Sequence, residues 1–183
     1  MNPLPGLDIG IPLTIFENAY TTLHYGENIV TTKTVLLEFL IGYYVYGSDR
    51  YQDALAYALN PYSTPKKDLY DYINSHKRWM VTTLFISEMS IISIFITSEH
   101  PELNIPFLIL LESTRYYSDM KKYLGIIKPL YIALMWTGAA IILPSVMYEH
   151  NYDILYSPQD YLPCTLTLFA ASNIVDNKDI IED

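Results

Sequence analysis

The stretch that most constrains the fold reads Val81-Thr-Thr-Leu-Phe-Ile-Ser-Glu-Met-Ser-Ile-Ile-Ser-Ile-Phe-Ile-Thr97. Apart from its hydroxyl side chains and Glu88 it is apolar. With Trp79 included, it approaches the roughly 20 residues that a transmembrane helix needs. In lipid every backbone polar group needs an internal partner, so a helix is the expected structure. The stretch therefore predicts a membrane-spanning helix over residues 79–97.

Four further apolar runs predict an all-α, multi-pass transmembrane helical bundle with about five spans. The runs cover residues 31–46, 105–114, 125–147 and 161–175. Gly138-Ala-Ala lies at the centre of the third of these, and small residues there suit close helix packing in lipid. Residues 1–30 read as an acidic, partly helical lead-in, so residues 31–183 are expected to form one transmembrane domain.

The Lys and Arg residues alternate between the segments that connect these runs. Residues 1–30, 98–104 and 148–160 contain none of them. The two segments between carry Arg50, Lys66, Lys67, Lys77 and Arg78, and then Arg115, Lys121, Lys122 and Lys128. By the positive-inside rule, basic segments face the cytoplasm or its topological equivalent. The alternation predicts an integral membrane protein with both basic segments on that side.

The overall composition excludes several classes of partner and site. The chain has 20 Asp and Glu residues against 11 Lys and Arg residues, which gives a net charge of −9. This balance argues against nucleic-acid binding, which needs a basic face. Cys164 is the single cysteine, so no disulfide forms within the chain. No protein partner is evident from the sequence.

Two pairs of aspartates four residues apart, Asp49 with Asp53 and Asp179 with Asp183, follow apolar runs. On a helix, residues four apart share a face, so each pair presents two carboxylates side by side. Taken alone, each pair is more typical of a solvated helix end. Both pairs, however, fall on the basic side of the predicted topology. Carboxylates and cations at one membrane face indicate a site for a divalent metal ion and a polyanion such as a diphosphate.

With these motifs the chain resembles the UbiA superfamily of intramembrane prenyltransferases. The family's first signature, Asn-Asp-x-x-Asp-Arg-x-x-Asp, is similar to residues 45–53, where Val45 and Tyr46 replace the leading Asn-Asp. The second signature, Asp-x-x-Asp-x-x-Gly-Asp, is similar to residues 176–183, with Asn173 just upstream. Residues 117–122 are similar to the family's Tyr-x-x-x-Lys-Arg segment. The likeness covers about residues 30–183.

The resemblance implies an all-helical bundle around a central cavity and an enzyme that transfers a prenyl group from a prenyl diphosphate to an acceptor, often aromatic. It implies Mg²⁺ ions, held by the Asp motifs, that bridge the diphosphate. The expected metal ligands are Asp49, Asp53, Asp176, Asp179 and Asp183, and the first four form the expected catalytic set. The expected substrate contacts are Arg50, Tyr117, Lys121, Lys122 and Asn173.

Two departures keep other interpretations open. Family members continue with further helices after the second motif, so the resemblance implies a partial or truncated member, and an inactive chain is one of the open interpretations. The altered first motif also suits a non-catalytic multi-pass membrane protein that binds at most a cation or a lipid. A soluble all-α isoprenoid synthase is a third interpretation, which the charge alternation disfavours. Glu38, Glu88 and Glu112 lie inside apolar runs, where a carboxylate usually faces protein or a polar cavity.

Overall fold

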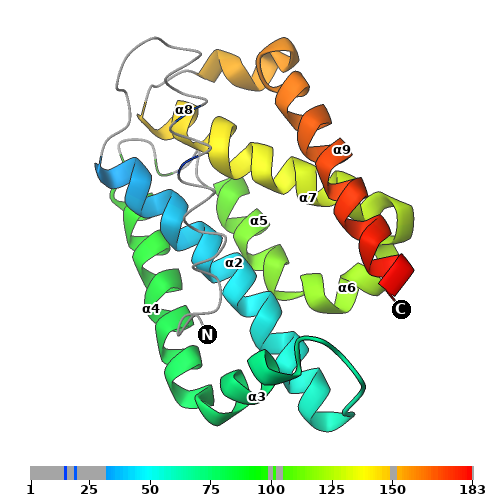
Figure 1. The fold of residues 1–183 in the computed structure, drawn as a ribbon. Coiled ribbons are helices and arrows are strands. Elements are labelled where there is room, and N and C mark those ends of the chain that lie inside the picture. The colour runs from blue at the N-terminus through cyan, green and yellow to red at the C-terminus, as the bar shows by residue number, and fades with distance from the viewer. Residues whose placement is uncertain are drawn as a thin grey trace.

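The computed structural model describes residues 15, 19, 32–98, 101, 105–148 and 152–182, and these form an all-α fold (Figure 1). The longest helices are α2 (Thr32–Leu59), α4 (Lys77–Ile96) and α9 (Pro158–Glu182). The shorter ones are α3 (Lys67–Ser75), α5 (Ile105–Arg115), α6 (Tyr117–Leu124), α7 (Lys128–Thr137) and α8 (Leu143–Tyr148). The predicted all-α class is confirmed. The predicted lead-in, residues 1–30, lies almost wholly outside the described residues.

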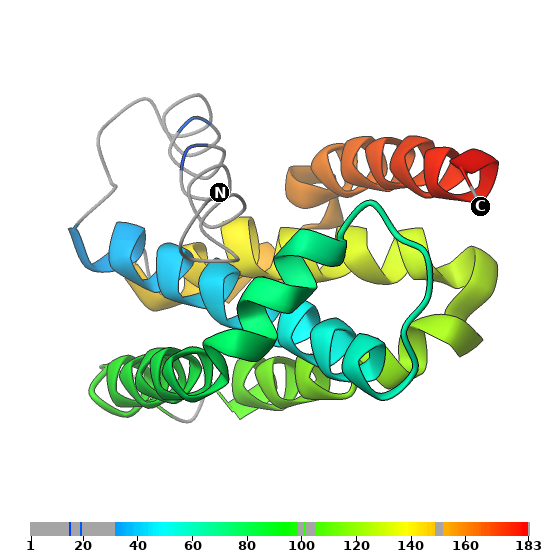
Figure 2. The same cartoon turned by 60° about the horizontal axis from the view of Figure 1, so that its bottom comes forward.

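Helix α2 is the central element, because α3, α4 and α5 all pack against it (Figures 1 and 2). Its apolar first half buries Leu37 and Tyr44 in the main core, together with Ile91 and Phe95 of α4. Tyr43 also hydrogen-bonds Thr83 of α4 at 2.7 Å. The helix continues to Leu59, well past the end of its apolar run at residue 46, so the first Asp pair lies within a helix and not in a connecting segment.

Helices α7 and α9 form a second pair that lies beside this core. Figure 1 shows α9 running back along α7 in the opposite direction, and the two helices contact each other extensively. The hydroxyl oxygens of Thr137 and Thr165 lie 3.0 Å apart. This contact shows that Thr137 of α7 lies beside Thr165 of α9. A small cluster of Ile141, Val146 and Ile154 closes the end of this pair.

The apolar runs do not become five helices of membrane-spanning length. Within the described residues, α4 is the one helix that is long and apolar enough to cross a membrane, so the prediction of about five such helices is wrong. Helix α5 has 11 residues, which at 1.5 Å per residue give about 17 Å against a hydrocarbon core of about 30 Å. Gly125, at φ 46°, separates α6 from α7. A run of apolar residues does not reveal such a break.

A π-helical turn, η3 (Gly138–Ile142), connects α7 to α8 in the middle of the longest apolar run. Such turns are rare, and they occur often at functional sites. Gly138 itself has ordinary helical angles, φ −59° and ψ −47°. A Cβ atom built on Gly138 meets no atom within 4 Å, so this turn borders open space.

Candidate functional site

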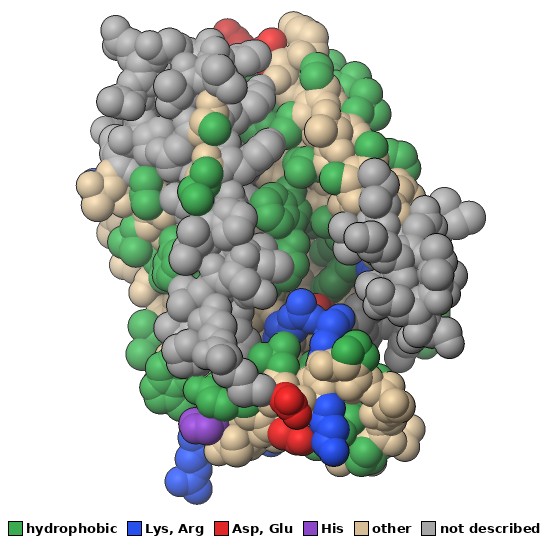
Figure 3. Space-filling model, in the orientation of Figure 1, with side chains coloured by type: hydrophobic (Ala, Val, Ile, Leu, Met, Phe, Trp, Pro, Cys, Tyr) green, Lys and Arg blue, Asp and Glu red, His purple; other side chains and the backbone are tan. Residues whose placement is uncertain are grey.

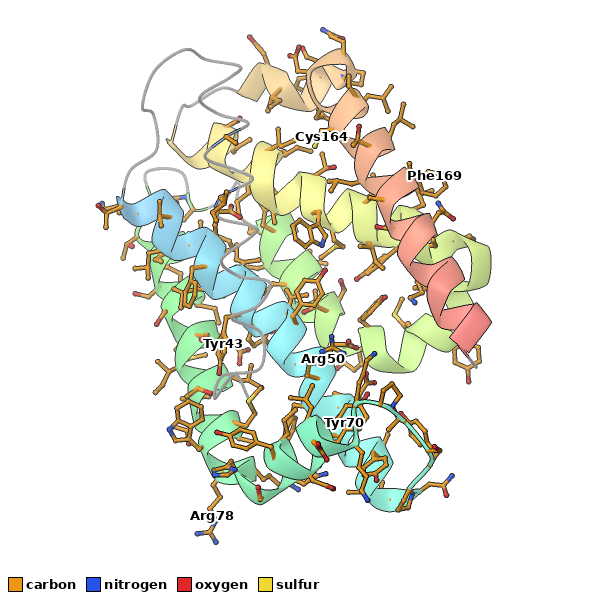
Figure 4. The ribbon with its side chains drawn as sticks, in the orientation of Figure 1. Tyr43, Arg50, Tyr70, Arg78, Cys164 and Phe169 are labelled. Carbon is orange, nitrogen blue, oxygen red and sulfur yellow. The ribbon has the colours of Figure 1, made fainter. Side chains whose placement is uncertain are left out.

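A cleft of about 280 Å³ opens between α2, α5, α6 and α7. Figure 3 shows Lys and Arg side chains beside a hollow in this face of the molecule, and Figure 4 shows Arg50 on the side of α2 that faces α6. The charged residues that line the cleft are Asp49, Arg50, Asp53, Lys66 and Lys128. The remaining lining residues are Val45, Tyr46, Thr114, Tyr117, Tyr131, Ile132, Met135 and Trp136.

One face of α2 runs from an apolar pocket to the charged part of the cleft. Ile41, Val45, Asp49 and Asp53 follow one another at four-residue intervals, so they form a stripe on that face. Twelve residues separate the first from the last, which corresponds to about 18 Å along the helix. Ile41 lines the apolar pocket, Val45 lines both spaces, and the two aspartates line the cleft. This periodicity is what places both carboxylates of the first motif on the same wall.

Helix α7 supplies a second stripe that runs in the opposite chain direction. Lys128, at its first residue, lines the charged part of the cleft, and Met135 lines both the cleft and the apolar pocket. Gly138 and Ala139 follow in the wall of the apolar pocket alone. The polar end of α7 therefore lies at the same end of the site as Asp49 and Asp53 of α2.

Aromatic side chains form two walls of the cleft. The indole Nε1–H of Trp136 donates a hydrogen bond of 2.7 Å to the hydroxyl of Tyr46, and the two rings meet edge to face with centroids 6.1 Å apart. Tyr117 and Tyr131 stack with centroids 5.4 Å apart and nearly parallel planes. The first pair joins α2 to α7 and the second joins α6 to α7. Both pairs hold the helices that carry the charged residues at a fixed separation.

A cluster of tyrosines on the α3 side of the cleft lies next to Asp53. Tyr70 is 2% exposed, and this burial raises the pKa of its phenol far above the ordinary value. The neighbouring Asp53 carboxylate and Tyr62 raise the pKa further, whereas Arg50 lowers it. Tyr57 packs against both other rings, with centroids 5.6 Å from Tyr62 and 5.4 Å from Tyr70. Tyr70 therefore remains a neutral phenol beside the carboxylate wall.

The structure brings together four of the residues that the sequence indicated, namely Asp49, Arg50, Asp53 and Tyr117. It adds Lys66 and Lys128, which the sequence placed in basic segments without giving them a role in the site. It also adds Tyr46 and Trp136. Tyr46 had counted only as a departure from the family motif, and tryptophans in apolar runs are more often packing residues. The available signal was weak, because Trp136 lies eight residues after Lys128 and therefore about 80° further around the helix, within one broad face.

The second Asp motif lies on the last turns of α9. Thr137 and Thr165 lie side by side and give a common reference point on the two helices. Lys128 is about 14 Å from Thr137 along α7, toward its N-terminus, and Asp176 is about 17 Å from Thr165 along α9, toward its C-terminus. Because the two helices are antiparallel, the backbone at Asp176 is near the level of the start of α7, at the charged end of the cleft. The side chains of Asp176 and Asp179, and residue Asp183, lie outside the described residues. That the two motifs share a metal ion stays a prediction.

The other predicted substrate contacts are only partly described. Lys121 and Lys122 lie on α6, one turn after Tyr117, and their side chains are outside the described residues. The side-chain amide of Asn173 donates to the carbonyl of Phe169, one turn earlier in α9, at 2.9 Å. Asn173 is not among the residues that line the cleft. Its predicted contact with substrate stays untested.

The donor set of the cleft fits Mg²⁺ that is bound together with a phosphate group. Within the part of the chain that the structure describes, no group of three or more His, Cys, Asp or Glu side chains could hold a metal ion. Among the described residues that line the cleft, Asp49 and Asp53 supply the carboxylate oxygens. Mg²⁺ commonly takes one or two carboxylates, keeps several waters and completes its shell with substrate phosphates. Two carboxylates beside three cationic side chains match that mode of binding.

A second, small apolar pocket of about 30 Å³ lies next to the cleft. Val45, Thr114 and Met135 line both spaces, so the two spaces are adjacent. The remaining walls are Ile41, Phe95, Phe107, Leu111, Gly138, Ala139 and Leu143. The site as a whole is therefore charged at one end and apolar at the other.

Comparison with protein-family models, with curated protein sequences and with solved structures finds no match to this chain. The relation to the UbiA superfamily therefore stays a prediction. It is based on residues 45–53, 117–122 and 173–183.

Proposed function

We propose that the protein is an integral-membrane, Mg²⁺-dependent prenyltransferase with a UbiA-like helical bundle, which transfers a prenyl group from its diphosphate to a small aromatic acceptor. The observation that carries the proposal is that a charged cleft and an apolar pocket lie next to each other along a single face of α2. A prenyl diphosphate has the same division, with a polyanionic head and a hydrocarbon tail.

The charged end has the groups that a diphosphate requires. Arg50, Lys66 and Lys128 come from three separate segments and line the same cleft, so they can contact different phosphate oxygens. Hydrogen bonds between such cations and phosphate are charge-assisted and roughly twice as strong as neutral ones. Asp49 and Asp53 would hold Mg²⁺ between the protein and the diphosphate. When bound, the ion neutralises charge on the diphosphate and so makes it a better leaving group.

The aromatic walls suit the reaction that this substrate undergoes. When the allylic carbon–oxygen bond breaks, its electron pair leaves with the diphosphate and the prenyl carbon becomes cationic. Tyr46, Trp136 and Tyr131 line the cleft together with Val45 and Met135, which also line the apolar pocket. Aromatic faces attract cations, by about 2 kcal/mol or more where water is excluded. An aromatic acceptor stacked here would form the new carbon–carbon bond and release a proton.

The outer surface supports a location in a membrane. Helix α4 is apolar on all sides, which is typical of a membrane span or of a helix at the centre of a large core. It does not lie at the centre of a core, because Phe85, Ile86 and Ile96 are 58, 57 and 64% exposed. Leu130 and Leu134 of α7, and Leu162 and Leu166 of α9, are also exposed. Lipid is the environment that these surfaces fit.

The experiment is calorimetric titration of the detergent-solubilised protein with inorganic pyrophosphate, and then with geranyl diphosphate, in the presence of Mg²⁺. We expect Asp53→Asn and Lys128→Gln each to weaken binding about tenfold or more, since a hydrogen bond to a charged group contributes about 1.5–3 kcal/mol. Matched controls are Asp71→Asn and Lys67→Gln, exposed positions on α3 that do not line the cleft. Equal losses in the control variants, or no loss in the cleft variants, would contradict the proposal.

A non-catalytic membrane protein is the second candidate, and one observation favours it. The positions of the family's leading Asn-Asp hold Val45, which is apolar, and Tyr46, whose hydroxyl accepts the Trp136 hydrogen bond. These positions supply no carboxylate. Transfer of a labelled prenyl group to a panel of aromatic acceptors separates the two candidates, because the non-catalytic protein would bind pyrophosphate with Mg²⁺ and yet form no product.

A further inference from the structure

The apolar pocket is closed at its far end by residues of the main core. Phe95 and Leu143 are 2 and 1% exposed, and Leu111 is 5% exposed. These side chains pack among α2, α4, α5 and α8, where a well-packed interior does not yield to an added group without strain. The pocket volume of about 30 Å³ corresponds to roughly two water-sized groups. The pocket therefore accepts the end of a hydrocarbon chain and not a long one.

The space in this pocket exists because residue 138 has no side chain. Gly138 lines the pocket at the start of the π-helical turn η3, and a Cβ atom there would meet no atom within 4 Å. Its backbone angles are those of an ordinary helix, so the glycine is not required for conformation. A larger side chain at this position would enter the pocket without disturbing the backbone.

We infer that Gly138 and Phe95 determine which prenyl donors this site accepts, and that the site selects short ones. The inference rests on the proposed function. Both residues line the apolar pocket, where Gly138 contributes no side chain and Phe95 contributes a buried ring. A short allylic diphosphate places its head between the charged residues and its methyl groups in the pocket. A longer chain meets Phe95 and has to leave part of its hydrocarbon outside the apolar walls. Each methylene that loses its apolar contact weakens binding about fourfold.

The experiment measures affinities in the presence of Mg²⁺ for inorganic pyrophosphate and for dimethylallyl, geranyl and geranylgeranyl diphosphates. In the wild-type protein we expect the prenyl compounds with short chains to bind at least tenfold more tightly than geranylgeranyl diphosphate. Gly138→Leu should weaken the prenyl compounds about tenfold and leave pyrophosphate unchanged. Phe95→Ala should remove the preference for short chains. Phe85→Ala, on the exposed face of α4, is the matched control and should change neither.

Each possible result of these binding measurements either supports the inference or overturns it. Equal affinity for all chain lengths in the wild-type protein, or an unchanged preference in Phe95→Ala, would overturn it and leave the proposed function intact, because pyrophosphate would still bind. Loss of pyrophosphate binding in the wild-type protein would overturn both. If Phe95→Ala does not fold, Phe95→Leu keeps an apolar side chain and removes the ring. Gly138→Ala, whose added methyl group has room, tests residue 138 in the same way.

Discussion

The hydrogen bond between Trp136 and Tyr46 gives the most direct test of the site, because it joins α2 to α7 across 90 residues of sequence. If these helices were not adjacent, the cleft would not exist. The perturbation is a double-mutant cycle with Tyr46→Phe, Trp136→Phe and the double variant. Both changes keep an aromatic ring and remove one member of the hydrogen bond.

The magnitude follows from the geometry. A hydrogen bond of 2.7 Å contributes about 0.5–1.5 kcal/mol net. Tyr46→Phe keeps its ring and leaves the half-buried indole N–H without this acceptor, so we expect it to lower the free energy of unfolding by about 1–2 kcal/mol. Trp136→Phe also alters an edge-to-face ring contact worth about 0.5–1.5 kcal/mol. The coupling energy between the two positions should be about 1 kcal/mol.

The assay is denaturant-induced unfolding in detergent micelles, followed by far-ultraviolet circular dichroism. The control cycle pairs Trp79→Phe with Tyr116→Phe, two side chains that are 48 and 63% exposed, for which we expect additivity within about 0.5 kcal/mol. A coupling energy for Tyr46 and Trp136 no larger than that of the control cycle would refute the α2–α7 contact and, with it, the cleft.

Three further predictions concern the glycines, the tyrosine cluster and the surface of α4. Gly138→Ala should raise the free energy of unfolding by about 0.4–1 kcal/mol, because the backbone angles at residue 138 suit any residue. Gly125→Ala should lower the free energy of unfolding by about 1–3 kcal/mol in the same denaturation assay, because the backbone there has φ 46°. Because the folded state raises the pKa of Tyr70, the contribution of Tyr70 to the free energy of unfolding should be constant below pH 10.0 and fall above it, as the unfolded chain releases a proton that the folded protein keeps. Tyr70→Phe should therefore reduce the fall in stability above pH 10.0, and an unchanged profile would contradict this. Phe85→Arg should reduce membrane insertion of α4 by about 3 kcal/mol in a glycosylation-mapping assay, whereas His76→Arg, just before the helix, should have little effect.

The helical class and the first acidic motif could be predicted because both depend on short-range spacing. Asp49 and Asp53 line the same wall of the cleft because residues four apart lie on one face of a helix. The length of α2 was not predicted, because the apolar run ends at residue 46, whereas the helix continues past the Asp pair to Leu59 with contacts to α3. The side-chain amide of Asn74, for example, donates to the Ala54 carbonyl at 2.9 Å.

The contacts that complete the site were beyond sequence reasoning because they join distant segments. Tyr46 and Trp136 are 90 residues apart, and Ser113 reaches the hydroxyl of Tyr131 at 3.3 Å from another helix. Neither contact leaves a periodic signal. The number of spanning helices was wrong for a related reason. Hydropathy reports composition, whereas the π-helical turn inside the run over residues 125–147 depends on local backbone conformation.

The π-helical turn has a consequence for how this chain can change over time. In an α-helix each residue advances the face by 100°, so an insertion or deletion rotates everything that follows it. A wider turn between α7 and α8 absorbs one residue and separates the register of Lys128 and Met135 from that of Leu143 and Val146. Deletion of one residue from this turn would therefore leave an ordinary α-helical turn, with the charged wall on α7 and the core residues of α8 on their present faces.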